Sequence, residues 1–195
     1  MRLDPSPDAP FALAPARVHE AEGAGRRSFA LLQAARHPGP LIWILPAHAS
    51  HLPMPRGLPA GVGERLHLVR PSGETDLLWS TEEALRSLAV ALVIAEPEQI
   101  LSLTAGRRLQ LAAEAGKTTG LMLIREGQGS NAAETRWYCE PIASPARDST
   151  LHRWSLTKNK RGTSGHWTLH WNGASDHLHL VSSAGERNGL AETPR

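Results

Sequence analysis

Apolar residues in the first two thirds of the chain recur in patterns typical of alternating strands and helices. Short apolar runs predict strands at residues 41–45, 66–69, 90–95 and 119–124. The run at 41–45 is continuous and bounded by turn residues, as in a central strand that is covered on both faces. Helices are predicted between these runs, one with an apolar face from Leu77 to Leu88 and one over residues 102–115. This rhythm predicts βαβ units and a mostly parallel sheet flanked by helices.

The stretch from Val18 to Arg36 is predicted to be a short strand, a tight glycine turn and a helix. Gly23 and Gly25 can adopt a positive φ in the turn because they carry no Cβ. In nucleotide-binding α/β proteins a phosphate loop lies at this place, with backbone N–H groups directed at the phosphates.

The chemistry of a phosphate loop is nevertheless missing here. Such a loop needs a Lys followed by Ser or Thr, and this chain has Arg26-Arg27-Ser28-Phe29. Glu96 follows the strand at 90–95, at the edge of the sheet where such folds hold magnesium. We therefore predict a degenerate nucleotide site, with no cofactor and no catalytic residue, made of Gly23, Gly25, Arg26, Arg27, Ser28 and Glu96.

A simpler interpretation of these residues stays open. The glycine turn could be purely structural, with two solvated arginines, and Glu96 could cap a helix or face solvent. Arg26 and Arg27 would still suit weak anion binding.

After Gly127 the apolar pattern changes to a period of two. Stretches at 135–140, 152–157, 167–171 and 177–181 predict antiparallel strands that extend the sheet. Residues 1–16 contain four prolines and are predicted to be a flexible lead-in, and residues 184–195 a flexible tail. A single domain is then expected from 17 to 183.

Composition narrows the class of protein. The 195 residues are 41% hydrophobic, enough for a packed core. A formal net charge of +2 is compatible with nucleic acid but does not require it. The single cysteine, Cys139, excludes an internal disulfide and fits a reducing compartment. No apolar run approaches the roughly 20 residues of a membrane span, and the acidic, Pro-rich start is unlike a signal peptide. We expect a cytoplasmic protein with no membrane partner.

Aromatic and basic residues suggest a second candidate surface. Trp43 and Trp79 are predicted in the core, whereas the four later tryptophans could either form a partner surface or pack beneath the sheet. Interleaved basic and aromatic residues can also bind single-stranded DNA, although a solvated turn would look the same. The candidate interface or DNA-contact residues are Arg153, Trp154, Lys158, Lys160, Arg161, Trp167 and Trp171.

The histidines of the last strands raise the question of a metal site. His166, His170, His177 and His179 lie close in sequence, but a zinc site needs three or four converging ligands. Outward-facing strand histidines are the favoured interpretation, and no metal is predicted.

Over residues 18–182 the chain resembles RecA-fold proteins of the ImuA type, accessory proteins of bacterial damage-induced mutagenesis related to SulA. Four places carry the resemblance: His19-Glu20 with Gly23-Ala24-Gly25, Asp76 to Ser87 with the strand that ends at Glu96, Glu134-Thr135-Arg136-Trp137, and Trp154-Ser155-Leu156-Thr157-Lys158-Asn159-Lys160-Arg161. The last is the most specific, because in active RecA filaments the lysines of that turn face the nucleotide of a neighbouring subunit. Here they would be Lys158 and Lys160.

Departures from the RecA pattern imply a protein that does not hydrolyse ATP. Phe29 or Arg27 stands near the place of the phosphate-loop Lys. Pro46-Ala47-His48-Ala49 supplies no acid to activate water, and Arg125-Glu126 replaces the Gln that senses nucleotide. Losing the phosphate-loop Lys and the general base together should remove many kcal/mol of transition-state stabilisation. The resemblance implies a RecA-like core with a mostly parallel sheet, extended by antiparallel C-terminal strands.

The resemblance also implies function and partners. It suggests a non-catalytic accessory protein of SOS-induced, error-prone translesion DNA synthesis, acting by protein–protein contacts in a mutasome. Its partners would be an ImuB-like relative of Y-family polymerases, an error-prone replicative-type DNA polymerase subunit and RecA. Two alternatives stay open: a SulA-like inhibitor that binds the tubulin-like division protein, and an active ATPase with an unusual loop.

Overall fold

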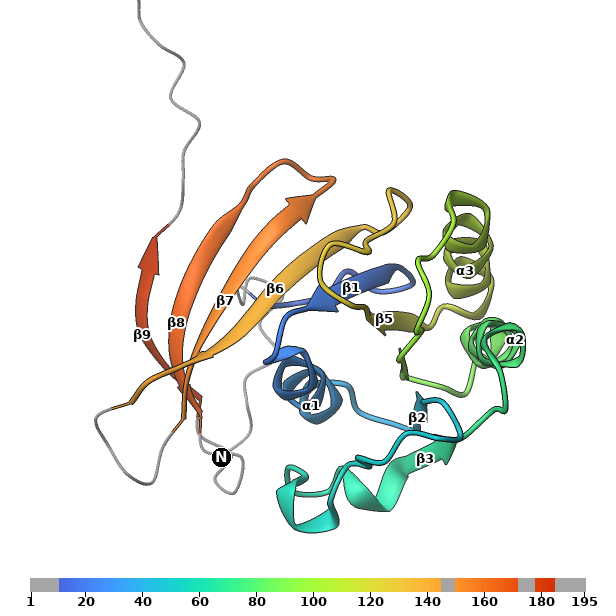
Figure 1. Cartoon of the computed structure of the whole chain (residues 1–195), viewed down its shortest axis with the longest axis horizontal. Helices are drawn as coiled ribbons and strands as arrows, with labels where there is room; N and C mark the ends of the chain where they lie inside the picture. Colours follow the sequence, from blue (N-terminus) through green and yellow to red (C-terminus); the bar gives the residue numbers. More distant parts are fainter. Residues whose placement is uncertain (1–10, 145–149, 172–177, 185–195) are drawn as a thin grey trace, which may run out of the picture.

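The computed structural model describes residues 11–144, 150–171 and 178–184. In these residues a single sheet contains nine strands in the order β3-β2-β4-β5-β1-β6-β7-β8-β9 (Figure 1). In chain order the elements are β1 (Val18–Glu22), α1 (Arg26–Arg36), β2 (Leu41–Ile44), β3 (Leu66–Val69), α2 (Glu74–Arg86), β4 (Leu92–Ala95), α3 (Leu103–Gly116), β5 (Thr119–Leu123), β6 (Thr135–Ile142), β7 (Thr150–Asn159), β8 (Gly165–Trp171) and β9 (Leu178–Ala184).

The coarse prediction of a mostly parallel central sheet extended by antiparallel C-terminal strands is confirmed. All pairs from β3 to β6 are parallel, and β7, β8 and β9 continue the sheet in antiparallel register. One detail of the prediction is wrong: β6 pairs in parallel with β1 and antiparallel only with β7. The reason is the loop after β5, which carries the chain back along α3 before β6 begins.

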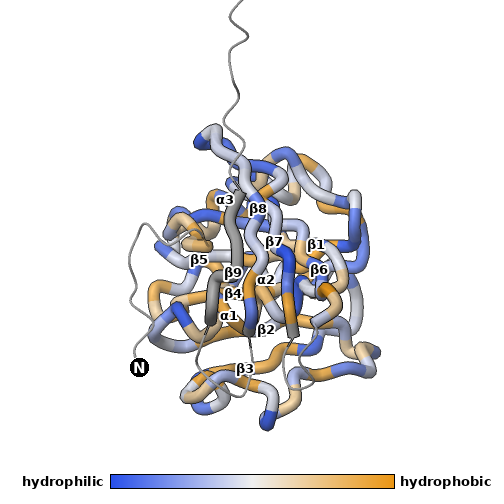
Figure 2. The backbone as a smooth tube through the Cα atoms, turned by 90° about the vertical axis from the view of Figure 1, so that its left-hand side faces the viewer, coloured by the Kyte–Doolittle hydropathy of each residue, from blue (hydrophilic) through white to orange (hydrophobic). Residues whose placement is uncertain are grey.

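Helices cover both faces of the sheet. On one face α1 packs over β1, β5 and β6, and on the other α2 and α3 lie side by side (Figure 1). The first face buries Trp43 and Leu121, and the second buries Val93 and Met122. Hydrophobic and hydrophilic stretches alternate at short intervals along the chain (Figure 2). Because successive side chains of a strand point to opposite faces of the sheet, each inner strand buries alternate residues in the two separate cores.

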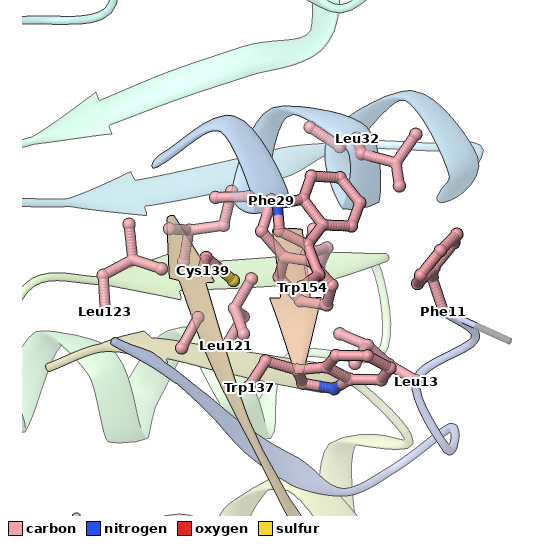
Figure 3. Packing of buried hydrophobic residues seen from close by; sticks show 14 of the residues in the cluster. Phe11, Leu13, Phe29, Leu32, Leu121, Leu123, Trp137, Cys139 and Trp154 are labelled. Atoms are coloured by element: carbon pink, nitrogen blue, oxygen red, sulfur yellow. The ribbon is translucent and has the colours of Figure 1, made fainter. Parts of the chain in front are cut away.

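The N-terminal segment belongs to the folded core from residue 11 onward. Phe11 and Leu13 are buried among the aromatic side chains of α1, β6 and β7 (Figure 3). The expected boundary between residues 16 and 17 is therefore placed too late, because this segment fills a gap that the strands and α1 leave open. At the other end, Ala184 closes β9. Of the ends that were expected to be flexible, 1–16 and 184–195, residues 1–10 and 185–195 lie outside the described residues.

Tryptophan placement matches the expectations only in part. Trp43 is buried as predicted, but Trp79 is 62% exposed, because Leu77 and Leu85 are the residues of α2 that face the sheet. Trp137 and Trp154 are fully buried, and Trp167 packs partly against the same core. The choice left open for the later tryptophans is thus decided for these three in favour of packing. The side chain of Trp171 lies outside the described part of the structure.

Among the helices of the described residues, none combines the length and the apolar character needed to cross a membrane.

Candidate functional site

The glycine turn between β1 and α1 is pressed against β6. The N–H of Gly25 donates to the Cys139 carbonyl at 2.8 Å, and a Cβ on Gly25 would lie 3.1 Å from that oxygen. Gly23 has a φ of +86°, and a Cβ there would clash with the same carbonyl. The close approach of β6 therefore requires a glycine at position 23 and leaves little room for a side chain at position 25. A phosphate loop would direct the Gly25 N–H at its ligand, but here that N–H donates a hydrogen bond to the Cys139 carbonyl.

Arg27 and Glu96 form a bidentate ion pair at the start of α1. Arg27 Nη2 lies 2.8 Å from Glu96 Oε2, and Arg27 Nε lies 3.0 Å from Glu96 Oε1. Trp43 Nε1 donates to Glu96 Oε1 at 2.9 Å, and Arg27 Nη1 donates to the His51 carbonyl at 2.8 Å. Glu96 is largely buried. The cation expected to meet phosphate and the carboxylate expected to meet magnesium thus neutralise each other.

The neighbouring residues of the predicted site are also engaged locally. Arg26 Nη1 donates to the carbonyl of Gly23 at 3.1 Å, and Ser28 is half-buried. Phe29 is fully buried, with ring centroids 5.1 Å from Trp137 and 5.0 Å from Trp154 (Figure 3). A side chain at position 29 therefore points into the core and away from any ligand.

A polar cleft of about 260 Å³ lies beside the Arg27–Glu96 pair, where the carboxyl ends of β2, β4 and β5 meet. Parallel α/β sheets bind ligands at this edge. Glu98 also lines the cleft, and its Oε1 lies 3.1 Å from His48 Nε2 and 3.7 Å from Arg125 Nη2. Arg26, Arg27 and Glu96 thus line one cleft, and two of its arginines, Arg27 and Arg125, face carboxylates of the same chain.

A second cluster of charged residues surrounds Glu20, which was not among the predicted site residues. Glu20 Oε1 accepts from the Ser130 N–H at 2.8 Å, and its Oε2 accepts from Arg136 Nε at 2.8 Å. Burial raises the pKa of Glu20, and the hydrogen bonds from Ser130 and Arg136 oppose that shift. The available signal was an acid in the strand predicted before the glycine turn, because a carboxylate that such a strand buries requires partners.

Lys158 and Lys160 fasten the loop between β5 and β6. Lys158 Nζ donates to the carbonyls of Ser130 and Asn131 at 3.1 and 2.8 Å, and Lys160 Nζ donates to Ala132 at 2.8 Å. Burial is the main reason that the pKa of Lys158 is lowered. Both ammonium groups therefore donate hydrogen bonds to backbone carbonyls of the same chain.

The remaining interface candidates are dispersed. Trp154 is completely buried, so it offers no contact surface and that prediction is wrong; as an inward-facing residue of β7 it joins the core. Arg153 Nη1 lies 3.1 Å from Glu140 Oε1 across the β6–β7 pair. Arg161 Nε, just beyond the end of β7, lies 3.6 Å from Glu134 Oε1. The described side chains therefore form no continuous basic and aromatic surface.

The histidines of β8 and β9 do not assemble with other ligands in the described part of the chain. No group of three or more His, Cys, Asp or Glu residues there could hold a metal ion. His177 lies outside the described residues, as does the side chain of His179.

Fold and site together define an α/β protein with a central strand–turn–helix unit. In this unit Gly25 and Arg27 are engaged by a hydrogen bond and an ion pair within the same chain. No model of a known protein family matches the sequence. Two curated relatives, each called Protein ImuA and each from a strain of Caulobacter vibrioides, are 34% identical to it over 152 residues. The aligned part is 69% of this chain and 61% of each relative, so the chain spans less than two thirds of their length. The chain belongs to the ImuA family.

Proposed function

We propose that this chain is a non-catalytic accessory protein of SOS-induced, error-prone translesion DNA synthesis, in which a RecA-like frame serves as a scaffold for protein contacts. Its place in the ImuA family supports a role in damage-induced mutagenesis. The arrangement of β1, the glycine turn and α1 at the middle of a mostly parallel sheet agrees with such a frame.

The observation that carries the proposal is the ion pair between Arg27 and Glu96. A phosphate would have to compete with Glu96 for Arg27, and magnesium would have to separate Glu96 from both Arg27 and Trp43. Either event leaves a buried polar group without a partner, which costs about 1–3 kcal/mol for each group. Nucleotide binding is therefore opposed by contacts that already stabilise the fold.

The proposed partners are an ImuB-like relative of Y-family polymerases, an error-prone replicative-type polymerase subunit and RecA. Direct DNA binding has weaker support, because Arg153, Lys158, Lys160 and Arg161 already contact acceptors of the same chain. A scaffold that carries out no ATP chemistry can act only through the surfaces that it presents.

A nucleotide titration tests the non-catalytic part of the proposal. Purified protein is titrated with a fluorescent ATP analogue in the presence of magnesium, and phosphate release is followed in parallel. We expect no saturable binding at micromolar nucleotide and no phosphate release above background. Tight binding that needs magnesium and is lost in Glu96→Gln would support the ATPase alternative instead.

A genetic test addresses the role itself. Deleting the gene should lower the frequency of damage-induced mutations, and the wild-type chain should restore it. Ser28→Ala removes the hydroxyl that would hold magnesium in a working phosphate loop, and this variant should complement fully. Unchanged mutation frequency on deletion would contradict the proposal. Filamentation of undamaged cells on overexpression would favour the SulA-like alternative.

A further inference from the structure

A groove of about 480 Å³ lies between α3 and the loop that joins β5 to β6. Its helical side contains Leu103, Arg107 and Leu111, and its opposite side is formed by Ala132 and Lys160. It shares no lining residue with the cleft beside the Arg27–Glu96 pair. The groove therefore belongs to a surface that the degenerate nucleotide site does not use.

The wall opposite α3 is held firmly in place. Lys160 donates to the Ala132 carbonyl, and Glu20 accepts from the Ser130 N–H. The loop also packs tightly on α3 at Gly106, where a Cβ would lie 2.6 Å from Ser130 Oγ. A groove built this way is preformed, so an occupant loses little free energy in shaping it.

Exposed apolar side chains line the helical side of the groove. Leu103 is 46% exposed and Leu111 is 64% exposed. They are eight residues apart on α3, which corresponds to about 12 Å along the helix axis. An occupant that covers both leucines must present two apolar groups with that separation.

The charges of the groove are all positive. Its ionisable lining residues are Arg107 and Lys160, and Arg107 has no ion pair or hydrogen bond among the described residues. Arg107 lies one turn from each leucine, midway between them. A carboxylate between two apolar groups would therefore be complementary to this surface.

We infer that the α3 groove docks a short segment of a partner protein in which two apolar residues, about 12 Å apart, flank an acidic residue that pairs with Arg107. The inference rests on the proposed function as an interaction protein. A second copy of this chain fits less well, because a symmetric contact through this groove would bring the same two cations together. Nucleic acid also fits less well, because the groove offers two leucines and few cations.

The test uses fluorescein-labelled, overlapping peptides that span the ImuB-like relative and the replicative-type polymerase subunit. Their binding to the full chain is measured by fluorescence anisotropy. At least one peptide with the acidic and apolar pattern should bind, and Arg107→Glu and Leu111→Ser should each weaken it about tenfold. Leu88→Ser is the matched control, since Leu88 is 75% exposed outside the groove and should leave binding unchanged.

Charge reversal makes the test specific. Replacing the acidic residue of the bound peptide by Lys should weaken binding to the wild type and restore binding to Arg107→Glu. All three substituted side chains are exposed, so the variants should keep the wild-type melting temperature.

Several outcomes would overturn the inference. The first is a peptide affinity that neither Arg107→Glu nor Leu111→Ser changes, and the second is the absence of any binding peptide. The third is light scattering that shows a dimer of the wild type and a monomer of Arg107→Glu. If the full-length partner co-purifies equally with wild type and Arg107→Glu, the proposed function stands and the groove is not its site. If no polymerase-related partner co-purifies with the wild type, the proposed function itself fails.

Discussion

At the scale of single residues, the buried ionisable side chains of β1 connect distant parts of the chain. His19 is fully buried, with Nδ1 2.7 Å from the Thr135 hydroxyl and Nε2 3.0 Å from the Ala14 carbonyl. A neutral ring satisfies both contacts by donating from Nε2 and accepting at Nδ1. Burial, more than the nearby cations, lowers the pKa of His19 to about 4.

This lowered pKa predicts that stability falls in mild acid. Between the ordinary value of 6.5 and about 4, the unfolded chain binds a proton at His19 and the native protein does not. The contribution of His19 to the free energy of unfolding is therefore complete above pH 6.5. It is lost as the pH falls toward 4, by up to about 3 kcal/mol. Urea unfolding at a series of pH values measures this slope.

The variant His19→Gln serves as the control for the pH prediction. It should show a shallower dependence of the unfolding free energy on pH, whatever its absolute stability. Some slope should remain, because burial also lowers the pKa of His37 and of His152. An unchanged slope in His19→Gln would show that other groups cause the acid sensitivity.

At the scale of elements, the junction of β1 and α1 owes its shape to β6. The sequence pattern predicts the strand, turn and helix correctly, and it allows both a phosphate loop and a structural turn. The hydrogen bond from Gly25 to the Cys139 carbonyl and the lack of space for a Cβ at Gly23 favour the structural turn. The two glycines thus fit the close packing of α1 against β6.

Substitution of Gly23 tests this explanation. Gly23→Ala should lower the free energy of unfolding by more than about 2 kcal/mol, because it adds a clash with β6 to an unfavourable positive φ. Gly127→Ala is the matched control: Gly127 also has a positive φ, +76°, but open space around its Cβ. That variant should lose only about 1 kcal/mol, the cost of the backbone conformation alone. Equal losses in urea unfolding would argue against the contact with β6.

At the scale of the whole molecule, the N-terminal segment completes the larger of the two cores. The ring centroid of Phe11 lies 5.2 Å from that of Trp154 and 5.5 Å from that of Trp167, with both ring pairs nearly perpendicular. Figure 3 shows Phe11 beside the buried aromatic residues. These contacts join residue 11 to β7 and β8, which are more than a hundred residues away in sequence. The segment thereby links the parallel and antiparallel parts of the sheet.

Truncation of Phe11 should therefore destabilise the entire fold. Phe11→Ala is expected to lower the free energy of unfolding by about 3–5 kcal/mol and to alter tryptophan fluorescence, since three indoles border the resulting cavity. Leu52→Ala, at a residue that is 39% exposed, should change stability by no more than about 0.5 kcal/mol. A similar melting temperature for both variants would contradict a core role for the segment.

The sequence by itself determined most of the elements and the lack of a Lys in the glycine turn. Periodic apolar residues and turn residues act within a few positions of one another, so β1, α1, β2, β4, α3 and β5 could be placed from local pattern alone. The lack of a Lys in the turn between β1 and α1 is likewise visible in the sequence, because it concerns only the identity of the residues there.

Only the tertiary structure decided which residues meet. Arg27 and Glu96 are 69 positions apart, and their ion pair depends on α1 lying beside the end of β4. The same holds for the inward position of Trp154, the outward position of Trp79 and the use of Lys160 to hold the loop beside α3. Periodicity tells which residues share a face of an element, but the neighbour of that face is chosen by packing across the whole chain.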